Sequence, residues 1–96
     1  MPMSIVLRKE DGTEIDHSDH AIAVRSLPRL AHYVPMLAWL DPYGKTVFNG
    51  VQREALLEEL RSANPETEDD RSLLDEIRRL CEAGRSPHRY LWIIGD

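Results

Sequence analysis

The sequence contains a single cysteine, Cys81, in 96 residues. One thiol has no partner for a disulfide within the chain, which excludes a disulfide-stabilised secreted scaffold and favours a reducing compartment. Long hydrophobic runs are also missing, because the longest wholly apolar stretch, residues 36–40, is far shorter than the ~20 residues that cross a bilayer. The first residues lack the basic and apolar regions of a signal peptide. We therefore expect a cytoplasmic protein with no membrane partner.

Basic residues are scarce relative to acidic ones, with 12 lysines and arginines against 17 aspartates and glutamates and a net charge of -5. Nucleic-acid binding needs a positively charged face, so we expect no such partner. The 5 glycines are scattered, and no phosphate-binding loop or dinucleotide fingerprint is present. A chain of this length forms one domain, residues 1–96, with a small core and little room for an internal active-site cavity.

Apolar periodicity and turn residues predict a small α+β domain. Residues 4–8 predict a strand, and Asp11-Gly12 predicts a hairpin turn that leads to a weak edge strand at residues 14–16. Residues 90–94 are apolar on both faces and predict a buried strand that pairs with the first one. We expect a sheet of about three strands, made of the N-terminal hairpin and the C-terminal strand, packed against an αα-hairpin.

Helix signals are clearest in the second half of the chain. A short amphipathic helix is expected from Leu27 to Val34, and longer ones after Asn49 and after Pro65. Asn49 and Gln52 have the spacing of a capping box, and Gly84 followed by Pro87 predicts the end of the last helix. Two segments stay open: residues 21–24 fit a strand or a helix start, and residues 46–48 fit a strand or the approach to the next helix.

Two clusters could carry chemistry, and neither pattern favours it. Residues 16–20 contain two histidines and two aspartates, but a metal site needs three or four converging ligands, so a solvated polar loop is favoured. Ser18 beside these residues resembles a hydrolytic triad only in composition, since neighbours on one short loop rarely reach the required geometry. Cys81 falls on the apolar stripe of its helix, which favours core packing over nucleophilic catalysis with His88. We assign no catalytic residue, metal or cofactor.

The most distinctive segment is residues 39–49, which combines three aromatic residues with turn and cap residues. In one interpretation Trp39 and Phe48 fill the core; in the other, Tyr43 marks a functional surface, because aromatic residues anchor many interfaces. Asp41-Pro42-Tyr43-Gly44 fits a type I turn. A second, basic and aromatic patch lies beside the last strand. The candidate partner-binding residues are Trp39, Asp41, Tyr43, Lys45, His88 and Tyr90.

Two motifs carry a family resemblance. Residues 41–49 read D-P-Y-G-K-T-V-F-N, and residues 90–96 read Y-L-W-I-I-G-D. Together with the leucine-rich stretch at residues 56–60, they resemble a group of small bacterial proteins that carry D-P-Y-G-x-T-x-F-N and a terminal Y-L-W-x-x-G-D. The resemblance covers roughly residues 35–96. It implies a bacterial cytoplasmic protein of unknown function and assigns no catalytic residue.

Three functions are compatible with these observations. The favoured one is a non-enzymatic protein-interaction module that binds a protein partner or associates with itself. The second is an acidic, immunity- or antitoxin-like protein that masks a basic partner, and it rests on size and net charge. The third, from another class, is a small enzyme or ligand-binding protein with a surface cleft near Tyr43 and His88.

Overall fold

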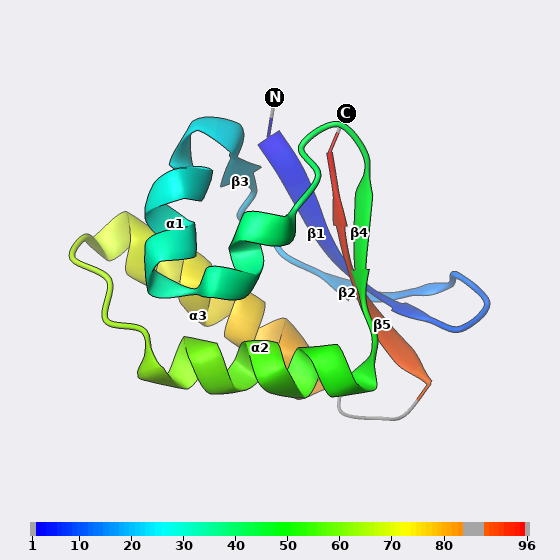
Figure 1. The fold of residues 1–96 in the computed structure, drawn as a ribbon. Coiled ribbons are helices and arrows are strands. Elements are labelled where there is room, and N and C mark those ends of the chain that lie inside the picture. The colour runs from blue at the N-terminus through cyan, green and yellow to red at the C-terminus, as the bar shows by residue number, and fades with distance from the viewer. Residues whose placement is uncertain (1, 84–87, 96) are drawn as a thin grey trace.

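The computed structural model describes residues 2–83 and 88–95, and its elements form two layers (Figure 1). The sheet contains β1 (Pro2–Lys9), β2 (Glu14–His17), β3 (Ile22–Ala23), β4 (Lys45–Phe48) and β5 (Arg89–Ile94). The helical layer contains α1 (Leu27–Tyr33), α2 (Gly50–Ser62) and α3 (Glu68–Ala83), with 3-10 turns η1 (Val24–Ser26) and η2 (Pro35–Trp39). All three α-helices lie on one face of the sheet (Figure 1). The predicted α+β class is confirmed, but the sheet has five strands instead of about three.

The C-terminal strand lies inside the sheet. The strand order is β2-β1-β5-β4, with β3 paired to the start of β1, and every pairing is antiparallel. In this register Ile93 lies opposite Ile5 on one side and Thr46 on the other. The predicted pairing of the last strand with the first is therefore confirmed, and β5 joins the N-terminal half of the sheet to β4.

The N-terminal hairpin closes at the predicted Asp-Gly turn. Gly12 has a φ of 90°, which glycine adopts without steric cost. Its N–H donates to the Lys9 carbonyl at 2.9 Å, and the Lys9 N–H donates to the Thr13 carbonyl at 2.9 Å. The carboxylate of Asp11 accepts the Thr13 N–H at 2.9 Å, which fixes the turn. The second strand of this hairpin, β2, is an edge strand as expected.

The two additional strands come from the segments that the sequence left open. Residues 21–24 divide between both alternatives, because Ile22 and Ala23 pair with Met3 and Pro2 while Val24 begins a 3-10 turn. Residues 45–48 form β4, which pairs with β5 over four residues. Both strands are short, so any alternation of apolar and polar residues in them covers too few positions to be decisive. Their extended conformation depends on a partner strand that is distant in sequence.

The core lies between the sheet and the helices. Alternate residues of β1 and β5 point into it, including Ile5, Leu7, Leu91 and Ile93, all of which are buried. The buried helix residues follow the predicted apolar stripes: Leu56, Leu57 and Leu60 on α2, and Leu73, Leu74, Ile77, Leu80 and Cys81 on α3. Helix α3 runs back across α2 (Figure 1). The helix end predicted at Gly84 and Pro87 lies outside the described residues.

Two local predictions are confirmed in detail. The side chain of Asn49 accepts the Gln52 N–H at 2.9 Å, and the side chain of Gln52 accepts the Asn49 N–H at 2.9 Å. This reciprocal pair is the predicted capping box at the start of α2. Cys81 is buried, and burial raises the pKa of its thiol to about 12. A thiol with this pKa stays protonated at neutral pH, and Cys81 packs in the core as expected.

Candidate interaction surface

The loop before β4 is built by Asp41. Its carbonyl accepts the Gly44 N–H at 3.3 Å, as expected for the predicted turn, and its carboxylate accepts the Tyr43 N–H at 2.9 Å. Its own N–H donates to the Thr46 hydroxyl at 3.0 Å. These three bonds fix the backbone of the turn, and the Tyr43 side chain stays 82% exposed. Asp41, a candidate partner-binding residue, therefore shapes the loop that presents Tyr43.

The two motifs of the sequence meet in the structure. The Gly95 N–H donates to the Gly44 carbonyl at 2.7 Å. From there β4 and β5 pair from Lys45 opposite Ile94 to Phe48 opposite Leu91. A Cβ atom at position 95 would lie 2.2 Å from the Pro42 carbonyl oxygen, so only glycine fits against this turn. The loop, β4 and the end of β5 form one packed unit.

Exposed hydrophobic residues gather in the same part of the chain. Among the described residues, the large hydrophobic side chains that stand out as exposed are Trp39 (71%), Tyr43 (82%), Val47 (40%) and Val51 (82%). All four fall within residues 39–51, which lead into β4, form it and begin α2. Phe48 fills the core at 2% exposure, as one interpretation expected, but the core position expected for Trp39 in that interpretation is wrong. Trp39 is the last residue of the 3-10 turn η2, and its side chain is exposed although Met36 and Leu37 of the same turn are buried.

Among the described residues, strand β4 forms a free edge of the sheet. It is the last strand in the order, and its known partner is β5. Because Gly44 and Gly95 are a hydrogen-bonded pair, the alternation of an antiparallel ladder makes Thr46 and Phe48 the next residues bonded to β5. The backbone groups of Lys45 and Val47 therefore point away from β5. These two residues present two N–H donors and two carbonyl acceptors along the edge.

No helix of the described residues lies on the opposite face of the sheet (Figure 1). Trp92 lies at the centre of this face, between Val6 on β1 and Val47 on β4. The guanidinium carbon of Arg8 lies 4.7 Å from the centroid of the Trp92 ring, and the Lys45 ammonium lies 5.4 Å from it. Both distances fall in the range of cation–π attraction. Two candidate residues, Lys45 and Tyr90, share this face because each is an even number of residues from the position that Trp92 or Val47 occupies on its strand.

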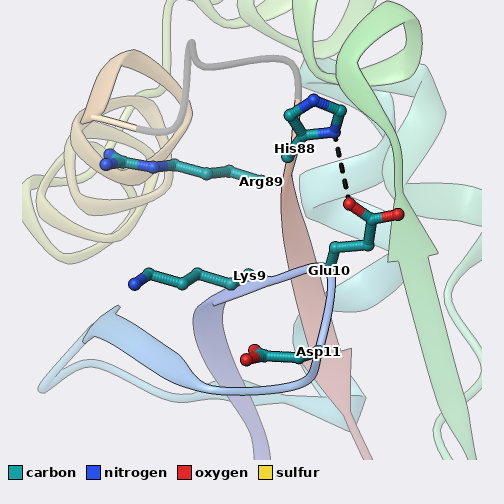
Figure 2. A pocket seen from close by; sticks show the side chains of 5 residues that line it. All are labelled: Lys9, Glu10, Asp11, His88 and Arg89. Carbon is teal, nitrogen blue, oxygen red and sulfur yellow. Dashed lines mark ion pairs between the residues drawn. The ribbon is translucent and has the colours of Figure 1, made fainter.

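His88 lies at the opposite end of β5 from Tyr43. Its Nδ1 is 3.3 Å from a carboxylate oxygen of Glu10 (Figure 2). These residues line a shallow pocket of about 500 Å³ together with Lys9, Asp11 and Arg89. The Arg89 guanidinium donates to the carbonyl of Ala83, the last residue of α3, at 3.0 Å.

Tyr43 and His88 do not line one cleft. Tyr43 adjoins the turn that bonds Gly95, whereas His88 precedes β5. The six residues of β5 extend over roughly 20 Å at about 3.3 Å per residue. The surface cleft expected near both residues is therefore wrong, and the candidate partner-binding residues divide between two ends of the sheet.

The histidine-rich loop does not gather into a metal site within the described residues. His17 Nδ1 lies 3.3 Å from a carboxylate oxygen of Glu14, and its Nε2 lies 3.7 Å from Asp19. The His20 N–H donates to the Ser18 hydroxyl at 2.9 Å. Across residues 2–83 and 88–95, no group of three histidine, cysteine, aspartate or glutamate side chains is placed to hold a metal ion.

No family model matches the chain, and neither a curated protein nor a solved structure matches it. In the part of the chain that the structure describes, no helix has the length and apolar character to span a membrane.

Three residues of this region were not singled out from the sequence: Val47, Val51 and Trp92. Val47 carried a usable signal, because Thr46 and Phe48 alternate with Lys45 and Val47 at the period of a strand. The exposure of Val51 and the central place of Trp92 depend on the sheet order. Sequence periodicity does not report which strand is an edge or which face is uncovered.

Proposed function

We propose that the chain is a protein-interaction module. Its binding site is the β4 surface, which we define as Trp39, Tyr43, Lys45, Val47 and Val51. The observation that carries this proposal is that the four strongly exposed large hydrophobic side chains of the described residues all belong to residues 39–51. Single exposed hydrophobic residues are common, but these four lie along one segment, which makes it the best candidate for a protein-binding surface.

The free edge supports the same function. An exposed edge strand binds an extended segment through its main chain, while neighbouring pockets and side chains select the partner. On β4 the outward backbone groups of Lys45 and Val47 lie between Tyr43, before the strand, and Val51, after it. Main-chain donors and acceptors flanked by apolar side chains suit a strand-forming protein partner better than a small polar substrate.

The charge of the β4 surface distinguishes an interaction module from an acidic protein that masks a basic partner. The charged side chain of the β4 surface is Lys45, whose ammonium contacts the Trp92 ring. A basic partner would meet a like charge there, so the net charge of -5 does not by itself favour the masking role at this site.

Photo-crosslinking in the source cell tests the proposal. Tyr43 is replaced by a benzoylphenylalanine, and Arg61, at the far end of α2, is replaced in a matched control. We expect a discrete protein adduct from position 43 and none from position 61, because a partner would lie against the β4 surface only. Absence of an adduct at position 43, and at position 39 in a second variant, contradicts the proposal.

Alanine substitutions separate binding from folding. Trp39→Ala and Tyr43→Ala remove exposed side chains, so the free energy of unfolding should change by less than about 0.5 kcal/mol. Phe48→Ala, a buried control on β4, should cost roughly 3–5 kcal/mol. Urea unfolding measures both. Weakened crosslinking from position 43 in Trp39→Ala, and from position 39 in Tyr43→Ala, at unchanged stability supports the β4 surface. A large loss of stability in Trp39→Ala contradicts it.

A further inference from the structure

We infer that the partner of the β4 surface is a second copy of this chain, whose β4 pairs with β4 in an antiparallel arrangement that places Lys45 opposite Val47. This inference rests on the proposed function, because it assigns the occupant of the same surface. The two sheets would join at their β4 edges, and the two-fold axis would pass between Thr46 of one copy and Thr46 of the other. The helices of both copies would then lie on the same face of one continuous sheet.

The hydrogen-bonding groups of the edge complement themselves in this arrangement. Lys45 and Val47 point their N–H and carbonyl groups away from β5, and Thr46 points its own toward β5. When Lys45 faces Val47 of the second copy, each N–H meets a carbonyl, and every outward group of both strands is paired. Thr46 then faces Thr46 of the second copy at a non-hydrogen-bonded position, where threonine pairs are favourable.

Charge excludes a neighbouring register. Shifting the strands so that Lys45 faces Lys45 of the second copy places two ammonium groups directly opposite each other, which destabilises the pair. Shifting them the other way, with Val47 facing Val47, leaves Lys45 opposite Asn49, beyond the end of the strand. Registers that place Lys45 opposite Thr46 fail because the Thr46 backbone groups are turned toward β5. The register with Lys45 opposite Val47 uses the whole edge and keeps the two lysines apart.

Exposed side chains near the β4 edge add apolar area to the contact. Tyr43 precedes β4 and Val51 follows it, so the antiparallel arrangement brings the Tyr43 end of one copy toward the Val51 end of the other. One aromatic side chain buries about 150–250 Å² when it is covered. The two exposed aromatic residues and two exposed valines of each copy are the apolar side chains available to bury toward the roughly 1,000 Å² that a specific interface needs.

Single cysteines test both the occupant and the register. The native Cys81 is buried and its thiol stays protonated, so it provides a silent background. Opposed residues at a non-hydrogen-bonded position have Cα atoms about 4.5 Å apart, inside the range for a disulfide. Thr46→Cys should therefore form a covalent dimer under mild oxidation, seen on non-reducing gels. Lys45→Cys and Val47→Cys alone are matched controls, because each would lie diagonal to its own copy, about 7–8 Å away.

A double variant covers the case in which Thr46→Cys disturbs the loop, because the Thr46 hydroxyl accepts the Asp41 N–H. Lys45→Cys with Val47→Cys places a thiol opposite a thiol twice per dimer, so it should crosslink several-fold faster than either single variant. Faster crosslinking of Lys45→Cys alone or Val47→Cys alone overturns the register.

Sedimentation of the unmodified chain decides the occupant. A dimer that Val47→Asp converts to monomer supports the inference. A monomer at every concentration tested overturns it. In that case an adduct with a different protein at position 43 would still uphold the proposed function, whereas absence of any adduct would end both proposals.

Discussion

The absence of a Cβ atom at Gly95 lets the end of the second motif pack against the turn of the first. The backbone conformation of Gly95 is not the left-handed one that requires glycine, because Gly12 has the only positive φ among the described residues. The constraint is space: a Cβ would lie 2.2 Å and 2.5 Å from the Pro42 carbonyl oxygen and carbon. Both atoms belong to the backbone, so neither can move without moving the turn that presents Tyr43.

Gly95→Ala should therefore destabilise the protein by at least about 1–3 kcal/mol, the usual range for an overpacked site. Gly50→Ala is the matched control, because its added Cβ meets only Arg53 at an ordinary 3.7 Å. Urea unfolding should show a lowered midpoint for the first variant and an unchanged or raised one for the second. Equal midpoints would mean that the turn and the end of β5 are not packed together.

The ion pair of Asp70 with Arg29 makes the stability of the fold depend on pH. The Asp70 side chain is 4% exposed and accepts two hydrogen bonds from the Arg29 guanidinium, at 2.7 and 2.8 Å. These bonds lower the pKa of the carboxyl group below its unfolded value of about 3.9. The stabilisation is fully present above the unfolded pKa and is lost as the pH falls through the folded one.

Asp70→Asn should reduce the free energy of unfolding by roughly 1–3 kcal/mol at neutral pH, because it removes a charged acceptor from a buried position. The difference from the unsubstituted chain should narrow below about pH 4. Thermal unfolding from pH 7 to pH 2 measures it. A difference that stays constant across this range would show that the carboxylate charge contributes nothing.

The elements that the sequence predicted well are those specified by nearby residues. The Asp-Gly hairpin, the turn at Asp41 and the start of α2 each depend on contacts within about four positions. The elements that the sequence left open depend on distant partners. β3 consists of two residues that pair with Pro2 and Met3, and β4 is extended because it pairs with β5. The exposed Trp39 was ambiguous for the same reason, since tertiary packing decides which residues of η2 are buried.

The capping box allows the local contribution to be measured. Asn49→Ala should cost about 1 kcal/mol, because it leaves the Gln52 N–H without its acceptor. Gln52→Ala removes the reciprocal bond. Since both bonds belong to one motif, the double variant should lose less stability than the two single losses added together. Additive losses in urea unfolding would show that the two bonds act independently.

The whole molecule depends on its last strand. β1 and β4 both pair with β5, and neither pairs with the other. Leu91 and Ile93 are fully buried between the sheet and the helices. The sequence predicted a buried C-terminal strand because residues 90–94 are apolar on both faces, but it did not predict that β5 would lie between β1 and a fourth strand. The central position of β5 depends on its pairing with β4, and the four residues of β4 are too few for their alternation to predict a strand by itself.

A chain that ends after His88 should therefore lose cooperative folding. Without β5, β1 and β4 would have no strand between them, and the core faces of the helices would be exposed. The Asp41 turn would also lose its hydrogen bond with Gly95. Urea unfolding should show a broad transition with a small slope, because little additional surface remains to be exposed. The full chain with Ile94→Ala, on the uncovered face, is the control and should keep a steep transition, whereas Ile93→Ala in the core should lower the midpoint by the equivalent of about 2–5 kcal/mol. A steep transition in the shortened chain would show that the remaining strands find another arrangement, and the β4 edge would then have a different partner within the fold.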